Sequence, residues 1–448
     1  MLFVLIWLRL DLGLMLVAFF APFHLLPANL FYRFSSMAEM TLIMCAVAWL
    51  LRRLLEWRTQ VSSARVSGVT PYVSRFTLHV LRFKSLDRAV LAFFAVSTLS
   101  MIAASYFEFA LREWRIIILE PVVYYALLRA SKLDRNAVWR IIDALVLAGV
   151  VVAAIGLVEY AFNLDFITAE EGTRRLRSVY GSPNNVGLFL GRVFPISLAC
   201  LLLGKGRRRA WYGLALLPII AAIVLSQSRG ALLLGIPASI LAIGLLAGGR
   251  WVWAALGALI AGALAAIPFL NSPRVQALLS GEGTQVFRVA LWRSTLNMIR
   301  EHPILGVGPD NFLYAYRGRY MLPEAWQEPG LSHPHNVVLD FSARLGLLGL
   351  AAFLWIQAAF WKIALPLRHA NFQSLDYAQD KLPTSNLQLP TSNLQTDGME
   401  RRALAIGLMA SMVDFLAHGL VDAAYFVVDL AFVFMLTLAL AQRMREEG

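Results

Sequence analysis

The sequence has few cysteines and few charges, and it lacks the signature motifs of several enzyme classes. Only two of its 448 residues are cysteine and only 15% are charged, whereas a soluble globular domain carries about 25% charged residues. Cys45 and Cys200 lie inside apolar runs, so we interpret them as small core residues and not as a disulfide or a metal-binding pair. The sequence contains no phosphate loop ending in GKS or GKT, no HExxH, no GxSxG and no DxD pair. These absences argue against ATP-driven transport and against soluble nucleotide-sugar chemistry.

What the chain has in abundance is apolar sequence. Hydrophobic residues make up 59% of it, and the mean hydropathy is +0.64. They form runs that approach the ~20 residues needed to cross the hydrocarbon core of a bilayer. These runs lie near residues 2–26, 37–51, 89–105, 114–130, 141–162, 184–203, 211–226, 230–247, 251–269, 336–361, 403–421 and 424–441. The pattern predicts an all-α, polytopic membrane bundle of about 12 transmembrane helices, formed by residues 1–448 as a single membrane domain with an uncleaved first span.

The positive charge predicts how the chain is oriented. The formal net charge is +12, but Lys and Arg cluster in short connectors between apolar runs, and basic patches interleaved with aromatics are absent from the sequence, so we expect no nucleic-acid partner. The alternate connectors that share a side with both termini carry about twice as many Lys and Arg, which predicts cytoplasmic termini by the positive-inside rule. Residues 270–335 then form a large, partly helical outer loop between spans 9 and 10. Residues 368–402, which repeat LPTSNLQ in tandem, form a low-complexity cytoplasmic linker without assigned function.

The junction SHPHN places two histidines where the outer loop enters an apolar helix. A neutral imidazole is the side chain most easily poised to accept a proton near pH 7, so His333 and His335 are candidate general bases, and Asn336 could hydrogen-bond one ring. Alternatively, the two histidines are interfacial residues that face water. Two histidines that flank a single residue offer only half of a zinc site, so we expect no metal and no other cofactor.

Two arginines on the same predicted side are suited to phosphate oxygens. Arg229 follows Ser226, Gln227 and Ser228 between two spans, although it could instead snorkel and orient a helix end. Arg288 lies on a helix that we expect to begin at Thr284, to run to Glu301 and to stop at Pro303. The residues that share its face are Arg288, Trp292, Thr295 and Ile299. The alternative for Arg288 is a solvated charge on an interfacial helix.

Other polar residues could contact a glycan or an acceptor. Asn184 and Asn185 could bind sugar hydroxyls, although capping of the following helix is the simpler account. Arg192 lies inside a span and needs a partner, for which Glu159 is one possibility. The basic cluster of Arg174, Arg175 and Arg177 is interpreted as a solvated run.

Two further sets of polar residues lie within the late spans. Asp414, His418 and Asp422 follow one another at intervals of four residues, which favours a polar seam along one helix, with Asp422 reaching the outer face, over a proton path or a metal half-site. Asp340 is the expected ion-pair partner of Arg344, one turn away.

The motifs together resemble the O-antigen ligase and O-antigen polymerase superfamily of bacterial membrane glycosyltransferases. The resemblance rests on GSPNNVGLFL, LSQSRGALLLG, FRVALWRSTLNMIREHPILGVGPDNF, SHPHNVVLDFSARLGLLGL and HGLVD. They occur in the family's order over about residues 150–440, whereas the first 150 residues match only in hydropathy. The positive charge at Arg344 departs from the family pattern.

The resemblance implies a function at the outer face of the bacterial inner membrane. A glycan on undecaprenyl diphosphate would be transferred to the hydroxyl of an acceptor lipid or glycan, without a metal and with inversion. Arg229 and Arg288 would bind the diphosphate, and His335 would be the base, with His333 as second choice. Possible glycan or acceptor contacts are Arg192, Asn184, Asn185, Asn336 and Asp422. Ligation, repeat-unit polymerisation and protein O-glycosylation remain open, and the alternatives from other classes are a polysaccharide transporter or flippase and a membrane scaffold.

Overall fold

The computed structural model shows an all-α membrane bundle, as the sequence predicts. It describes residues 1–25, 36–67, 83–164, 166–168, 174–271, 276, 284–326, 328–369 and 391–447. The first half contains helices α1 (Leu2–Leu8), α2 (Leu10–Phe20), α4 (Met37–Ser67), α6 (Ser85–Ser100), α7 (Phe107–Glu113), α8 (Glu120–Ala130), α9 (Arg135–Phe162), α10 (Pro183–Leu203) and α11 (Gly206–Ser226). The second half contains α12 (Ile236–Ala247), α13 (Arg250–Ala266), α15 (Thr284–Glu301), α16 (Phe312–Ala315), α17 (Val337–Ala364), α19 (Thr391–Gly419) and α20 (Val428–Glu446).

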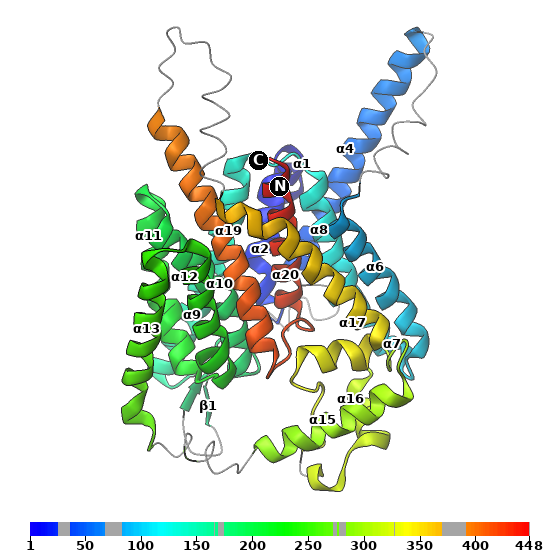
Figure 1. Ribbon diagram of the computed structural model, residues 1–448. Helices are drawn as coiled ribbons and strands as arrows, with labels where there is room; N and C mark the ends of the chain where they lie inside the picture. Colours follow the sequence, from blue (N-terminus) through cyan, green and yellow to red (C-terminus); the bar gives the residue numbers. More distant parts are fainter. Residues whose placement is uncertain are drawn as a thin grey trace.

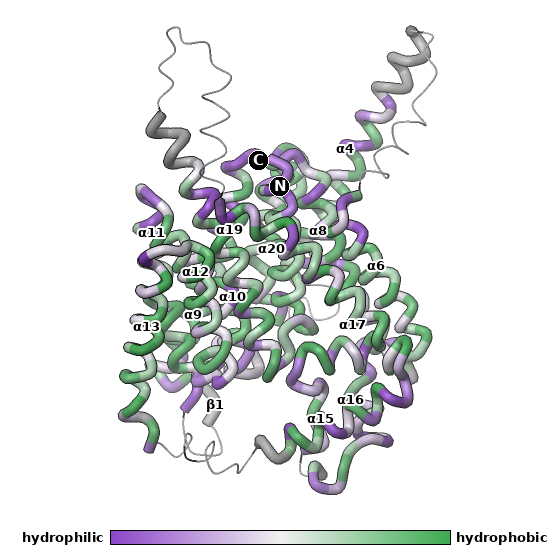
Figure 2. Tube along the Cα trace, in the orientation of Figure 1, coloured by the Kyte–Doolittle hydropathy of each residue, from purple (hydrophilic) through white to green (hydrophobic). Residues whose placement is uncertain are grey.

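The apolar runs coincide with these helices for most of their length. Within the described residues, five helices are long and apolar enough to cross a membrane by length and composition alone. They are Ser85–Ala103, Arg135–Phe162, Pro183–Leu203, Gly206–Ser226 and Val337–His369. Shorter apolar helices add Leu10–Phe23, Ala231–Ala247 and Arg250–Ala266. Figure 2 shows hydrophobic residues across the middle of the bundle and hydrophilic residues concentrated toward its two ends.

The two ends of the bundle differ in structure. The N- and C-termini lie together at one end, whereas α15, α16 and a short hairpin lie at the other (Figure 1). The hairpin pairs β1 (Phe166–Thr168) with β2 (Arg174–Leu176) in antiparallel register. The two termini and α15 thus lie at opposite ends of the bundle.

Small residues let the central helices approach closely. Gly191 on α10 and Gly235 before α12 both face the carboxylate of Asp414 on α19, where an added Cβ would collide with it. Close packing of helices through glycine is typical of membrane bundles, because it allows strong van der Waals contact without a hydrophobic driving force between helices. Among the described residues, α10 packs extensively against both α19 and α11.

A break in α17 receives the outer loop. Gly346 has φ 71° and ψ −174° inside the helix, a conformation that glycine adopts without a Cβ penalty. The freed backbone groups bond to the PILGVG segment: Val307 N–H donates to Ala343 O at 2.8 Å, Gly308 N–H to Arg344 O at 3.1 Å and Leu347 N–H to Pro303 O at 2.7 Å. The loop is thus fixed to the first three turns of α17, which carry the histidine junction at their start.

One boundary differs from the sequence prediction. The linker predicted at 368–402 lies mostly outside the described residues, but helix α19 already begins at Thr391, so the last part of this range is helical. Residues 403–412 of α19 are packed in the core of the bundle, and the helix continues from them back to Thr391. Of the predicted loop 270–335, the structure describes residues 270–271, 276, 284–326 and 328–335, and α15 spans Thr284–Glu301 as predicted.

Candidate active site

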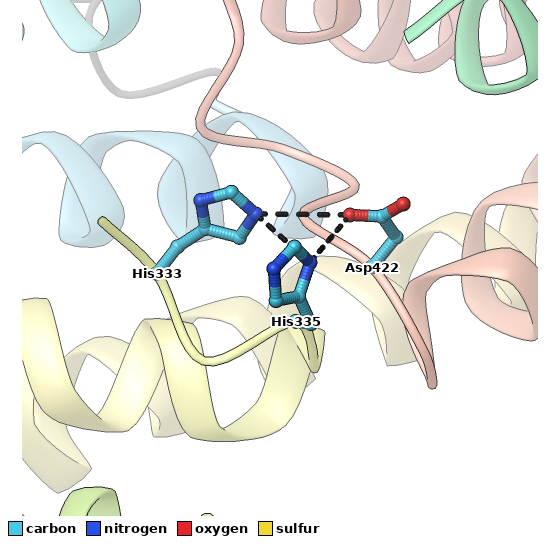
Figure 3. A group of neighbouring side chains, drawn as sticks. All are labelled: His333, His335 and Asp422. Carbon is cyan, nitrogen blue, oxygen red and sulfur yellow. Dashed lines mark hydrogen bonds and ion pairs between the residues drawn. The ribbon is translucent and has the colours of Figure 1, made fainter. Parts of the chain in front are cut away.

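Three side chains from two distant segments form the centre of the site. His335 Nδ1 lies 2.9 Å from Asp422 Oδ1, and His333 Nε2 lies 3.1 Å from the same histidine nitrogen. His333 Nε2 is also 3.7 Å from Asp422 Oδ1. Figure 3 shows both rings turned toward the carboxylate. Asp422 is buried, whereas the two imidazoles are partly exposed, so the cluster has one closed side and one open side.

The histidine junction is held by hydrogen bonds to two neighbouring helices, α15 and α17. Trp292 Nε1–H on α15 donates to the carbonyl of Pro334 at 2.8 Å. Asn336 caps α17, because its side-chain oxygen accepts from the N–H groups of Val338 and Leu339 at 3.0 Å. His335 itself has φ 50°, the left-handed conformation that turns the chain from the loop into the helix. Fixed backbone on both sides of the two rings favours a single arrangement of the imidazoles.

The buried guanidinium of Arg344 also holds the histidine junction in place. Arg344 donates to the carbonyl of Ser332 at 3.0 Å and to Asp340 Oδ1 at 2.7 Å. The predicted Arg344–Asp340 pair is therefore confirmed. A second carboxylate, that of Glu113 on α7, lies 2.5 Å from the Arg344 guanidinium and was not predicted. The network ties α7, α17 and the residue before His333 into one unit.

The electrostatics of the cluster keep His335 neutral. Burial lowers the pKa of His335, and the neighbouring His333 lowers it further, while the hydrogen bond to Asp422 opposes both effects. Burial alone would raise the pKa of Asp422, but the hydrogen bonds from His333 and His335 outweigh it and hold that pKa well below its usual range. An ionised Asp422 beside a neutral His335 favours the tautomer with the proton on Nδ1, which leaves the lone pair on Nε2.

Arg288 and Arg229 lie within electrostatic range of this cluster. Burial lowers the pKa of Arg288, the charge of Asp422 raises it and the charge of Arg229 lowers it. Gly230 packs directly against His418 and Val421, so Arg229 adjoins the segment that carries Asp422. On the face that the helical spacing predicts for Arg288, Thr295 is buried and Arg288, Trp292 and Ile299 are half-buried. Four groups far apart in sequence, His335, Asp422, Arg288 and Arg229, therefore lie at one end of the bundle.

Arg192 is placed elsewhere than predicted. It is buried, and its Nη2–H donates to the carbonyl of Ala424 at 3.1 Å. Its carboxylate partner is Asp414, 3.8 Å away, and not Glu159, so that pairing is wrong. Because its guanidinium is enclosed by protein groups, the predicted glycan contact has no support in this arrangement.

The asparagines also have structural partners. Ser182 caps α10, not Asn184 or Asn185, and Asn184 accepts a hydrogen bond from Arg175 at 2.7 Å. Arg175 also donates to Ser226 O at 3.0 Å, so the prediction of a solvated basic run is wrong for this residue. Asn336 caps α17 and donates to Leu420 O, which replaces the predicted bond to an imidazole.

The predicted polar seam is divided between helix and connector. Asp414 and His418 are buried on α19, but this helix ends at Gly419, so Asp422 leaves the stripe and lies in the connector to α20. This end of the helix lets Asp422 turn toward the histidines. The sequence placed Asp422 at the end of the polar seam and among the possible glycan contacts, but it did not predict the contact with His335. The feature of the sequence that could have pointed to Asp422 was the polar end of the HGLVD motif.

The comparisons with known proteins agree with these motifs. Residues 213–354 match the O-antigen ligase family. A protein of Rickettsia conorii, named as a candidate polysaccharide ligase, is 32% identical over 104 residues, which cover 22% of this chain and 25% of the relative. A protein of Rickettsia prowazekii with the same description is 30% identical over 109 residues, also 22% of this chain and 25% of the relative. The chain thus aligns with about a quarter of the length of these curated relatives. The family match covers Arg229, Arg288 and both histidines, and it confirms that this chain resembles the O-antigen ligase superfamily through the segment that carries its candidate site.

Proposed function

We propose that this chain transfers a glycan from an undecaprenyl-diphosphate-linked donor to an acceptor hydroxyl at the outer face of the bacterial inner membrane. The observation that carries the proposal is the contact between His335 and Asp422 beside Arg288. The similarity to polysaccharide ligases supports a glycosyltransferase-like enzyme. Both termini are proposed to face the cytoplasm, because the connectors on their side are richer in Lys and Arg.

The chemistry needs a base on one side of the sugar and positive charge on the other. His335 Nε2 would accept the proton of the acceptor hydroxyl, while the hydroxyl oxygen attacks the anomeric carbon of the donor sugar. The bond from that carbon to the diphosphate oxygen breaks, and the lipid diphosphate leaves with the electron pair. Attack opposite the leaving group inverts the anomeric carbon.

Each residue of the site has a task in this scheme. Asp422 would hold His335 in the reactive tautomer and stabilise the imidazolium that forms, as a carboxylate does in a Ser-His-Asp triad. Arg288 and Arg229 would bind the diphosphate and neutralise the charge that develops on it. Since the lipid diphosphate is already a good leaving group, most of the rate enhancement would come from positioning and electrostatics.

The test uses purified full-length chain in detergent, a lipid-diphosphate glycan and candidate acceptors. We expect glycosylated acceptor from the wild type and from His302→Ala, a control that changes an exposed histidine of the outer loop. His335→Ala should make no product while it elutes and melts like the wild type. Product size distinguishes a single transfer from a polymer ladder. Full transfer by the His335→Ala variant would contradict the proposal, and glycan movement across vesicles without a new glycosidic bond would indicate a transporter.

A further inference from the structure

The three side chains at the centre of the site also have the composition of a metal site. Two imidazoles and a carboxylate are the ligands found in catalytic zinc sites, where a fourth position stays open. The sequence offered only the two histidines, which is half of such a site. The structure adds Asp422, 87 residues further along the chain than His335. We propose that His333 Nε2, His335 Nδ1 and Asp422 Oδ1 bind a divalent cation of the zinc class, and that this cation and glycan transfer exclude one another.

The distances among the three ligand atoms fit a tetrahedral cation. With metal–ligand bonds of about 2.0–2.1 Å, two ligands of a tetrahedral zinc lie about 3.3 Å apart. The three separations here are 2.9, 3.1 and 3.7 Å. They bracket that value, so a cation could enter with small side-chain shifts. Figure 3 shows the three groups facing a common point.

Neighbouring groups already orient the ligands as a metal site requires. Ser332 Oγ lies 3.1 Å from His333 Nδ1, which turns Nε2 of that ring toward the cluster. The N–H of Ala423 donates to Asp422 Oδ1 at 2.9 Å. Hydrogen bonds of this kind fix the tautomer and the direction of metal ligands in proteins. The pair of histidines is further stiffened by Pro334, whose carbonyl is bonded to Trp292.

The mutual exclusion of cation binding and glycan transfer follows from the tautomer of His335. This step of the proposal rests on the proposed function. A cation on Nδ1 takes the lone pair of that nitrogen, so the imidazole proton moves to Nε2 and no proton is released. Nε2–H cannot accept the proton of an acceptor hydroxyl. Metal occupancy would therefore stop transfer without blocking the donor site.

Metal binding is tested on purified full-length chain from which metal has been stripped. The chain is titrated with Co²⁺, whose visible absorption reports tetrahedral coordination, and the bound Co²⁺ is then displaced with Zn²⁺. We expect one saturable site in the wild type and in His302→Gln, and at least tenfold weaker binding in His333→Gln and in Asp422→Asn. Arg288→Gln should bind Co²⁺ more tightly, because a nearby positive charge is lost. No tetrahedral spectrum in the wild type, or equal affinity in all variants, would overturn the site. His333→Gln keeps the test decisive if Asp422→Asn does not fold.

Exclusion is tested separately by the transfer assay. Zn²⁺ at saturating concentration should abolish transfer by the wild type and by His302→Gln, and EDTA should restore it. Undiminished or faster transfer with bound Zn²⁺ would overturn the exclusion while leaving the binding result intact. A chain that binds Co²⁺ as expected but never transfers glycan, with or without EDTA, would refute the proposed function and with it the exclusion, and would leave the metal site standing.

Discussion

Arg344 on α17 and Glu113 on α7 form a buried ion pair, with 2.5 Å between Nη1 and Oε1. Both side chains are almost fully enclosed, at 4% and 7% exposure. Asp340 is the second carboxylate on Arg344, and the same guanidinium bonds the carbonyl of Ser332, next to His333. A charge buried between helices thus supports the backbone of the proposed base.

Loss of this guanidinium should destabilise the protein strongly. Arg344→Met leaves two buried carboxylates without their cation, and breaking a buried pair in this way costs about 3–5 kcal/mol. We expect a clear fall in the thermal unfolding midpoint in detergent. We also expect weaker transfer, since Ser332 loses its anchor.

The matched control is Arg319→Met, which breaks the Arg319–Glu301 pair on the surface of the outer loop. Arg319 is 68% exposed there, and an exposed pair contributes only about 0–1 kcal/mol. Equal midpoints for the two variants would show that the buried network does not contribute to stability as argued.

Asp422→Asn should change both the rate of transfer and its pH dependence. His335 must be neutral to act as a base, so transfer rises with pH through the pKa of His335, which burial lowers from its usual value. Asp422 raises that pKa, so its removal lowers the pKa further and moves the acid limb of the profile to lower pH. The maximal rate should fall by about 10²–10⁴-fold, the usual contribution of general-base catalysis.

A profile of transfer rate against pH for both proteins checks this prediction. Movement of the acid limb to higher pH in Asp422→Asn, or an unchanged maximal rate, would contradict the role of Asp422.

The fold was predictable because hydropathy and charge act locally. Apolar runs near ~20 residues must be helical in a bilayer, where every backbone group needs an internal partner. The helix from Thr284 to Glu301 and the Arg344–Asp340 pair followed from spacing along a single helix. The start of α19 inside the LPTSNLQ repeat could not be predicted in this way, because the repeat has no helical spacing of apolar residues. The helix reaches Thr391 by continuing from packed residues further along the chain.

The site was predictable only in part, because its contacts join distant segments. His335 and Arg288 could be named from their types and their place at a predicted interface. Asp422 could not be paired with His335, since an interval of four residues suggested a continuous helix and gave no sign of its end at Gly419. Glu159 was named as one possible partner of Arg192, whereas the approach of α10 to α19 through Gly191 brings Arg192 to Asp414.

Arg288 and Arg293 offer a direct comparison on one helix. Both lie on α15, but Arg288 is half-buried near Asp422 whereas Arg293 is exposed. Arg288→Gln should raise KM for the lipid-diphosphate donor and lower kcat, because the charge on the leaving diphosphate is less well neutralised. Arg293→Gln should leave both constants unchanged. Steady-state kinetics with varied donor measure the two effects, and equal losses in both variants would mean that only the general charge of the outer loop matters.

Gly346→Ala tests the break in α17 that receives the outer loop. The glycine has φ 71°, and an added Cβ would collide with the carbonyl group of Ile304. Backbone strain of this kind costs about 1–3 kcal/mol before the collision is counted. We therefore expect a lower unfolding midpoint, together with weaker transfer as the loop moves away from the histidines.

The control for this variant is Gly262→Ala on α13, where an added Cβ meets open space. Alanine is favoured over glycine in a helix by about 0.5–1 kcal/mol, so the midpoint should rise or stay constant. Melting curves and transfer rates for both variants decide the matter. If Gly346→Ala melts and transfers like Gly262→Ala, the loop is not held by this break, and the position of His335 depends on its other contacts, such as the Trp292 and Arg344 hydrogen bonds.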